Sequence, residues 1–405
     1  MRKGWQEKTL ADVCEIRPQK SEARERVAVD ALVSFAPMGD LGIDRKFLNA
    51  SQVKPLKSVV GSYTYFADGD VLLAKITPCF ENGKLGIAAD LSNGIGFGSS
   101  EFIVLRPSVG LDKAFLYYYL SRAVFRSEGA AHMGGAVGQQ RVPKEFIENY
   151  PIPLPPLPEQ QRIVGILDKA FEGIATAKAN AEKNLQNARA IFESHLQAVF
   201  TQRGVGWTRS RLEDVVDSSC TLSYGIVQPG RDCSNGLPLV RPKDLTARVT
   251  TLNGLKRIEP KIAEGYRRTA LRGGELLLCV RGSTGVVSVA APELAGANVT
   301  RGIVPILFDT SLLCLNFAYF LMTSEAVQSQ IHEKTYGAAL MQINIGDLRK
   351  VVISFPSLKE QKEIAVRLDE LSAETQTLRS IYQQKLAALD ALKKSLLHQA
   401  FSGAL

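Results

Sequence analysis

Residues 153–163 read Pro-Leu-Pro-Pro-Leu-Pro-Glu-Gln-Gln-Arg-Ile, and residues 355–364 read Phe-Pro-Ser-Leu-Lys-Glu-Gln-Lys-Glu-Ile. The two stretches share a leucine followed two residues later by Glu-Gln, and these leucines, Leu157 and Leu358, are 201 positions apart. Each stretch stands directly before a long segment with helical periodicity. A motif that returns once at such a distance indicates that the chain is built from two copies of one unit.

The repeat extends over most of the chain. The pattern Trp-x4-Leu-x-Asp-Val at residues 5–13 returns at 207–215, and Gly-Asp-Val-Leu-Leu-Ala at 69–74 returns as Gly-Glu-Leu-Leu-Leu-Cys at 274–279. From Leu157/Leu358 to Phe200/Phe401 the offset stays at 201, whereas it drifts by a few residues elsewhere. A segment whose length is the same to the residue in both copies is expected to fix a distance between other parts of the protein.

The two segments with this constant offset, which begin at Leu157 and Leu358, are each predicted to be a single helix of about 44 residues. The second opens with Ser357-Leu358-Lys359-Glu360, which fits a capping box, and Gly403 is placed to end it. The first follows a proline-rich run, which a helix tolerates only in its first turn. The predicted apolar stripes are Ile163, Leu167, Ala170, Ile174, Ala177, Ala181, Leu185, Ala188, Phe192 and Val199 in the first, and Ile364, Leu368, Leu371, Leu378, Leu389, Leu392 and Leu396 in the second.

The stripes follow the 3.5-residue period of a coiled coil, so we expect the two helices to pack on each other. The alternative is that they form an interface with another chain. The residues before each helix are predicted to form mixed α/β domains, with strands at 70–74, 102–105, 275–280 and 303–307 and short helices at 113–124 and 316–331. The predicted boundaries are therefore 1–155 and 203–354 for the domains and 156–202 and 355–405 for the helices.

Composition and charge narrow the class of protein. Apolar residues make up 45% of the chain and charged residues 22%, which is typical of a globular protein. No apolar run reaches the ~20 residues of a membrane span, and the N-terminus does not resemble a signal peptide, so a cytoplasmic location is expected. Residues 1–202 hold 24 Lys and Arg against 22 Asp and Glu, and residues 203–405 hold 25 against 19, so the excess positive charge of +8 lies mainly in the second half. Such a cluster suits a phosphate backbone, or else a solvated basic face.

Sequence motifs of the common enzymes are missing. There is no GxxxxGK[ST] phosphate loop, and the glycine-rich stretch 93–99 precedes a predicted strand instead of linking a strand to a helix. The nearest match to the [DNS]-P-P-[YFW] motif of adenine methyltransferases is Leu154-Pro155-Pro156-Leu157, which lacks both ends. The six cysteines have no metal-ligand spacing and are expected to be reduced thiols. We therefore expect a binding protein without a catalytic or metal site.

The whole pattern resembles the specificity subunits of type I restriction-modification enzymes. The two Glu-Gln stretches carry this resemblance, together with the segment Gly274-Glu-Leu-Leu-Leu-Cys-Val-Arg-Gly-Ser-Thr-Gly285. It implies an α+β fold, a tandem pseudo-twofold repeat of two target-recognition domains joined by two long antiparallel coiled-coil helices. It further implies that each domain reads one half of a split target in double-stranded DNA.

The resemblance also implies partners. Two methyltransferase subunits would bind S-adenosylmethionine and dock along the helices, and restriction subunits that act as translocase and nuclease would use ATP and Mg²⁺. The chain itself would hold no cofactor. A type IIB-like restriction-modification system remains a close alternative, and a DNA-independent coiled-coil scaffold or a fused methyltransferase or nuclease remain more distant ones.

Base reading requires Arg or Lys for guanine and Asn or Gln for adenine, and such groups occur in the loops after the central strands and before the long helices. The residues predicted to bind DNA in the first domain are Lys75, Thr77, Lys84, Gln139, Gln140 and Arg141. Those in the second domain are Arg281, Ser283, Thr284, Arg301, Gln342 and Asn344, with Arg241 and Lys243 as phosphate contacts.

Overall fold

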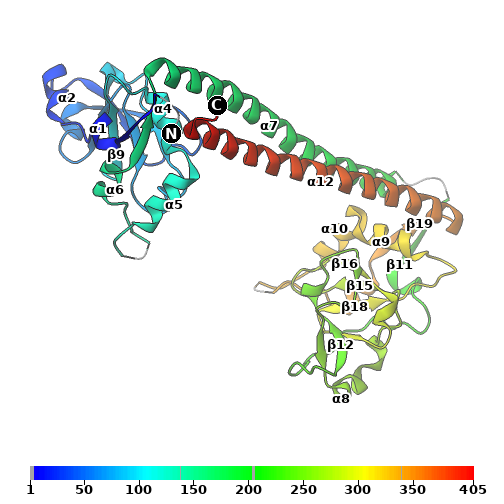
Figure 1. Ribbon diagram of the computed structural model, residues 1–405. Coiled ribbons are helices and arrows are strands. Elements are labelled where there is room, and N and C mark those ends of the chain that lie inside the picture. Colours follow the sequence, from blue (N-terminus) through cyan, green and yellow to red (C-terminus); the bar gives the residue numbers. More distant parts are fainter. Residues whose placement is uncertain (1–3, 137, 203–205, 339) are drawn as a thin grey trace. The chain divides into compact units, whose positions relative to one another are not determined.

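The computed structural model describes residues 4–136, 138–202, 206–338 and 340–405. It divides into two compact units, the first formed by residues 1–182 with 384–405 and the second by residues 183–383. Each unit thus combines one globular part with a portion of both long helices, which Figure 1 labels α7 and α12. The prediction of two mixed α/β repeats with long helices is confirmed, although the compact units do not end where the predicted domains end.

Unit 1 contains two four-stranded sheets, ordered β2-β9-β6-β7 and β4-β3-β8-β5, and a two-stranded sheet of β1 and β10. Its strands are β1 (Gln6–Thr9), β2 (Cys14–Ile16), β3 (Leu32–Ala36), β4 (Gln52–Pro55), β5 (Thr64–Ala67), β6 (Val71–Ala74), β7 (Leu85–Ile87), β8 (Ile95–Gly98), β9 (Phe102–Pro107) and β10 (Pro151–Leu154). Its helices are α1 (Leu10–Val13), α2 (Ser21–Arg26), α3 (Leu56–Val59), η1 (Ser92–Gly94), α4 (Lys113–Leu120), α5 (Ala123–Ala131), α6 (Lys144–Glu148) and the first part of α7 (Leu157–Thr201).

Unit 2 repeats this arrangement with sheets ordered β13-β16-β15-β18 and β14-β12-β17 and the pair β11-β19. Its strands are β11 (Thr208–Arg211), β12 (Leu237–Val240), β13 (Val249–Thr250), β14 (Lys256–Ile258), β15 (Leu276–Cys279), β16 (Val287–Ala290), β17 (Asn298–Val299), β18 (Ile303–Ile306) and β19 (Val352–Phe355). Its helices are η2 (Leu212–Asp214), η3 (Pro242–Asp244), α8 (Pro260–Ala263), η4 (Glu264–Thr269), η5 (Pro292–Leu294), α9 (Leu315–Thr323), α10 (Glu325–Glu333), α11 (Ile345–Arg349) and the first part of α12 (Leu358–Ser402).

The predicted strands appear as β6, β9, β15 and β18, but each predicted short helix is two helices in the structure. In unit 2 the break lies at Ser324, which has extended backbone angles and donates its hydroxyl to the Leu321 carbonyl. Because serine competes for backbone groups in this way, it favours helix ends over helix interiors. The apolar periodicity continues through the break and conceals it from sequence reasoning.

The long helices pack against each other within each unit. In unit 1, Lys178 Nζ lies 2.6 Å from Asp390 Oδ1, and Arg162 donates a hydrogen bond of 2.9 Å to the Leu405 carbonyl. These pairs run in opposite directions along the chain, so the two segments are antiparallel. The predicted stripe is wrong at Leu378 and Leu392, which are 39% and 47% exposed. A straight helix drifts by ~20° per heptad relative to a strict 3.5-residue repeat, so a stripe extrapolated over such a length loses register.

The end of α12 is part of the core of unit 1. The Phe401 ring packs edge-on against Phe115 and Tyr119 of α4, with centroids 5.0 and 5.1 Å away. Leu397 and Ala400 join the same cluster. Aromatic pairs in this geometry add stability beyond the buried area. Unit 1 therefore depends on residues far from its globular part in sequence.

A buried glutamine fixes the start of each long helix to its own globular part. Gln160 accepts a hydrogen bond from the Asp112 amide at 2.8 Å and donates to the Gly110 and Pro155 carbonyls at 2.9 Å each. Gln361 makes the same three bonds in unit 2, with the Cys314 amide and the Leu312 and Pro356 carbonyls, at 3.0, 2.8 and 2.9 Å. Both side chains are fully buried. The Glu-Gln motif therefore has a structural role inside each unit.

A buried ion pair links the two larger sheets of unit 1. Arg106 on β9 donates to both carboxylate oxygens of Asp70, at 2.8 and 3.0 Å, and to Glu22 of α2 at 2.8 Å. Tyr65 on β5 also donates to Glu22, at 3.0 Å. Asp70 is 1% exposed, so its charge depends on this partner. In unit 2 the corresponding Glu275 accepts instead from backbone amides, among them that of Gly273 at 2.9 Å.

None of the described helices is both long enough and apolar enough to cross a membrane.

Candidate nucleic-acid interface

In unit 1 the loop after β6 pairs with the segment that precedes α6. The Thr77 amide donates to the Gln140 carbonyl and the Val142 amide to the Lys75 carbonyl, both at 2.9 Å. Arg141 also exchanges two backbone hydrogen bonds with Gly134, at 2.9 and 3.1 Å. Ile76, Arg141 and Gly134 therefore stand next to one another across three short extended segments.

Unit 2 repeats this pairing with different side chains. The Gly282 amide donates to the Met341 carbonyl at 2.8 Å and the Ile343 amide to the Val280 carbonyl at 3.0 Å. Gln342 and Tyr336 exchange two backbone hydrogen bonds, at 2.8 and 2.9 Å. We call each set of three adjacent residues a bridge row. The bridge row of unit 1 is Ile76-Arg141-Gly134, and that of unit 2 is Arg281-Gln342-Tyr336.

A glycine gives each hairpin loop its shape. Gly135 and Gly337 have φ of +121° and +122°, a region that other residues rarely adopt. A Cβ atom at Gly337 would lie 2.4 Å from the Leu340 carbonyl oxygen, and one at Gly135 would lie 3.1 Å from that of Gln139. The two loops therefore both begin with a glycine of positive φ and have the same pairing at their ends, while they differ in side chains and, by one residue, in length.

The cations of the unit 1 loops are paired with a carboxylate. Arg141 donates to both oxygens of Glu101, with a shortest contact of 2.8 Å, and Lys75 Nζ lies 3.9 Å from the same carboxylate. The hydrogen bonds from Arg141 lower the pKa of Glu101 despite partial burial, so this carboxylate is ionised at neutral pH. Burial is the main reason why the pKa of Lys75 is lowered. One carboxylate thus offsets part of the charge of these two cations.

The other predicted residues of unit 1 divide into two groups. Thr77 donates to Glu81 at 2.8 Å, and Lys84 donates to the Met38 carbonyl at 2.8 Å, so both side chains have internal partners. Gln139 is exposed and Gln140 half-buried, at the tip and side of the loop. Sequence reasoning missed Glu101, which directly precedes β9 and whose role appears only once the loops are brought together.

The unit 2 loops carry an excess of positive charge. The structure gives no ion pair to Arg281 or Arg301 among the residues it describes. Arg301 occupies the turn that in unit 1 contains Glu101, because the Val280 amide donates to the Gly302 carbonyl as the Lys75 amide does to that of Glu101. One turn thus supplies an anion in unit 1 and a cation in unit 2.

The remaining predicted residues of unit 2 surround this bridge row or lie apart from it. Ser283 is exposed, and Thr284 donates its hydroxyl to the Met341 carbonyl at 3.2 Å. Asn344 caps α11 by accepting from the Asp347 amide at 2.8 Å, and Arg241 holds Asp244 through two hydrogen bonds of 2.9 and 3.0 Å. Lys243 is exposed. Contact of these residues with DNA stays a prediction, but Asn344 and Arg241 already have structural partners.

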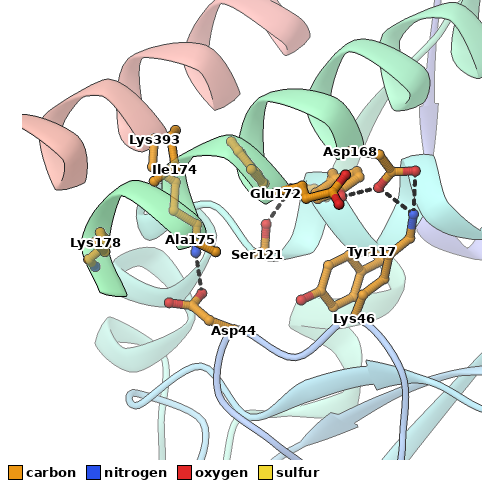
Figure 2. A pocket seen from close by; sticks show the side chains of 12 residues that line it. Asp44, Lys46, Tyr117, Ser121, Asp168, Glu172, Ile174, Ala175, Lys178 and Lys393 are labelled. Carbon is orange, nitrogen blue, oxygen red and sulfur yellow. Dashed lines mark hydrogen bonds and ion pairs between the residues drawn. The ribbon is translucent and has the colours of Figure 1, made fainter. Parts of the chain in front are cut away.

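Unit 1 also contains a cavity of about 310 Å³ between the loop of residues 44–46, α4, α7 and α12 (Figure 2). Each of its three lysines is paired: Lys46 with Asp168 at 2.5 Å, Lys178 with Asp390, and Lys393 with Asp44 at 2.7 Å. Tyr118 also donates a hydrogen bond to Asp168. With its cations neutralised in this way, the cavity does not suit an anionic ligand. Two of its ion pairs hold the globular part to the helices, and the third joins the helices to each other.

Among the residues that the structure describes, no group of three or more His, Cys, Asp or Glu side chains could hold a metal ion. The six cysteines are free.

Two copies of one α/β framework, each with its own bridge row and each followed by a long helix, define a tandem protein with two related loop sites. A family profile described as the type I restriction modification DNA specificity domain matches residues 2–186 and 204–386. The chain belongs to this family, and the resemblance drawn from its sequence is confirmed.

Individual relatives agree with this assignment. The chain is 40% identical over 221 residues to the type I restriction enzyme EcoAI specificity subunit of Escherichia coli, a match that covers 54% of the chain and 36% of that protein. The match therefore spans little more than a third of this curated relative.

Solved structures share the fold. The HsdS subunit from Thermoanaerobacter tengcongensis has 20% identity and a TM-score of 0.67, and the match covers 100% of this chain and 98% of that one. A chain from a structure described as the structural basis underlying complex assembly and conformational transition of the type I R-M system has 21% identity and a TM-score of 0.79, with 100% and 99% covered.

Proposed function

We propose that the chain is the DNA-reading subunit of a type I restriction-modification enzyme and that each unit reads one half of a split target in double-stranded DNA. The observation that carries this proposal is the pair of bridge rows, which share backbone geometry and differ in every side chain. A common frame with exchangeable side chains is what two unrelated half-sites require. The framework comes from a family whose description names DNA specificity.

The side chains of the rows suit base reading. Arginine pairs with guanine through two hydrogen bonds, and glutamine pairs with adenine in the same way. Arg281 and Gln342 are adjacent in the bridge row of unit 2, and in unit 1 Arg141 directly follows Gln140 and is paired with the Glu101 carboxylate. We expect unit 2 to bind phosphates and bases more strongly than unit 1 does. Within the described part of the chain, Arg281 and Arg301 need not break an ion pair with a carboxylate before they bind DNA, whereas Arg141 must.

The proposal includes partners. The chain would carry out no chemistry and hold no cofactor, while two methyltransferase subunits would supply S-adenosylmethionine, and restriction subunits would supply ATP-driven translocation and cleavage with Mg²⁺. The complex would act in the cytoplasm, on the DNA of the cell. The relatives support a type I system over a type IIB-like one, because those matched bear type I names.

The test is to co-express the chain with the methyltransferase encoded beside it and to map adenine methylation over the host genome. Methylation of one split motif on both strands, absent when this chain is omitted, would support the proposal. A complex that methylates without sequence preference, or no DNA binding at modest salt, would contradict it and favour a scaffold.

Arg281→Ala is expected to weaken DNA binding by about 1–3 kcal/mol and to relax the preference at one base position. The reason is the loss of a bidentate contact to guanine from the bridge row. Affinity should be measured on the target and on its single-base variants. Unchanged affinity and unchanged preference would remove Arg281 from the interface. Arg349→Ala, at the exposed last residue of α11, serves as the matched control for the loss of one arginine, although it also gives up a long hydrogen bond to the Leu222 carbonyl.

Glu101→Gln is expected to strengthen DNA binding several-fold, because Arg141 and Lys75 lose their carboxylate and become available to phosphates. Each additional phosphate contact makes the dependence of log K on log salt steeper by about 0.9. Affinity measured across a salt series gives both quantities. Glu145→Gln, at an exposed position of α6, is the control, and equal effects of the two changes would mean that only net charge matters.

A further inference from the structure

Three large apolar side chains are exposed on one short loop of unit 2. Tyr336 is 49% exposed, and Leu340 and Met341 are 45% exposed each. A single exposed apolar residue is common in proteins, but a group on one loop indicates contact with something outside the chain.

Hydrogen bonds anchor the backbone of Tyr336 and Met341, at the two ends of this loop, to the framework of unit 2. The Met341 carbonyl accepts hydrogen bonds from the Gly282 amide at 2.8 Å and from the Thr284 hydroxyl at 3.2 Å. The two hydrogen bonds between Tyr336 and Gln342 close the other side of the loop. The backbone that carries the exposed apolar side chains is therefore attached to unit 2 on both sides.

The surroundings of the loop favour a polyanion over an apolar protein partner. Arg281 lies in the same bridge row as Tyr336, and the charge of Arg301 acts on Tyr224, whose hydroxyl donates to the Ile343 carbonyl at 3.2 Å beside the loop. The described residues provide no ion-pair partner for either arginine. An apolar partner surface would have to bury these charges unpaired, which is costly. DNA pairs them with phosphates and offers apolar groups of its own.

The corresponding positions of unit 1 are polar or lack a side chain. By the backbone pairing, Tyr336, Leu340 and Met341 correspond to Gly134, Gln139 and Gln140. At these three positions the apolar character is therefore a property of unit 2 and not of the shared framework. Residues that vary in this way on a constant frame are suited to determine which bases are read.

We propose that Tyr336, Leu340 and Met341 form an apolar base-contact surface that takes the 5-methyl groups of thymine in the major groove. This inference rests on the proposed function. Of the four bases, thymine alone presents a methyl group there, and apolar side chains recognise it by contact. The half-site of unit 2 then contains at least one A·T pair whose thymine methyl meets this loop, next to the bases that Arg281 and Gln342 contact.

The test removes the methyl group and leaves base pairing intact. The target is first selected with the full-length chain from a random duplex library, and each thymine of the enriched sequence is then replaced by uracil, one at a time. We expect one or two positions in a single half-site at which uracil weakens binding about three- to five-fold. The variant with Leu340→Ala and Met341→Ala should bind the thymine duplex as weakly as the native chain binds the uracil duplex, and it should no longer distinguish the two.

The control is Val249→Ala, which shortens a similarly exposed apolar side chain on β13 of the same unit. It should keep full sensitivity to uracil, and the circular dichroism spectra of all variants should match. Specific binding that is indifferent to uracil at every position would overturn this inference and leave the proposed function standing. Selection that enriches no sequence would overturn both. Loss of a protein partner, with uracil sensitivity retained in the double variant, would assign the loop to that partner instead.

Discussion

Arg106→Met is expected to destabilise unit 1 by about 3–5 kcal/mol. The change removes both hydrogen bonds to Asp70 and leaves its buried carboxylate with only the Ala67 amide as a partner. It also frees Glu22, through which β9 is connected to α2 and β5. The large effect arises because water cannot replace the guanidinium at a side chain that is 1% exposed.

The size of this loss should depend on pH. Burial raises the pKa of Asp70, and the hydrogen bonds and charge of Arg106 act against that rise, so in the variant only the Ala67 amide still opposes it. A carboxyl whose pKa is higher in the folded than in the unfolded state takes up its proton more readily on folding. The variant should therefore regain stability as the pH falls toward the raised pKa of Asp70, and its deficit should be greatest at neutral pH and above.

Each unit has a single tryptophan, because the chain contains two, Trp5 and Trp207. Urea unfolding followed by fluorescence in a Trp207→Phe background reports on unit 1, and the Trp5→Phe background reports on unit 2. The double variant Asp70→Asn with Arg106→Met serves as the control, since it replaces an unpaired charge by a neutral amide. It should recover a large part of the loss, and no recovery would show that Arg106 acts through packing.

Gln361→Ala is expected to destabilise unit 2 by about 2–4 kcal/mol and to lower its unfolding temperature by about 5–15 °C. The change leaves one backbone amide and two carbonyls without partners at a fully buried position. Because these bonds connect the first turn of α12 to the loop before α9, their loss should also loosen the helix relative to its globular part. Thermal unfolding in the Trp5→Phe background measures the effect.

Two further variants separate the amide from the space that it fills. Gln361→Glu keeps the size of the side chain but directs an oxygen at the Leu312 and Pro356 carbonyls, so it should be at least as harmful as alanine. Gln383→Ala, at an exposed position of the same helix, should change stability by less than about 0.5 kcal/mol. A harmless Gln361→Glu would mean that shape and not hydrogen bonding holds the helix start.

Much of the fold could be predicted because the repeat gives two copies of the sequence pattern of most elements. The strands β6 and β15 follow from apolar runs after a Gly-acid pair, and the helices α7 and α12 follow from an offset that does not change. The buried face of the helices could not be predicted fully. An apolar stripe does not reveal whether a residue contacts the other helix, a globular part or neither. Phe401 packs on the globular part, whereas Leu392 is largely exposed.

The candidate site was predictable in kind but not in detail. Loops after the central strands and before the long helices were predicted to supply base-reading groups, and the structure adds that the pairing of residues 76 and 141 and of 281 and 342 brings these loops together. The state of each side chain depends on residues distant in sequence. Glu101 neutralises Arg141, and Asp244 engages Arg241, so composition alone overstates the free charge in unit 1 and near η3.

Because residues 384–405 are part of unit 1, this unit cannot complete its folding until the end of the chain has been synthesised. A ribosome produces the globular part of unit 1 first, but Leu397, Ala400 and Phe401, which pack on α4, emerge only after all of unit 2 has been made. Until then the aromatic face of α4 lacks its cover. The nascent chain therefore waits through about 200 residues of translation, roughly 10–40 s at 5–20 residues per second, with an apolar surface that chaperones can bind.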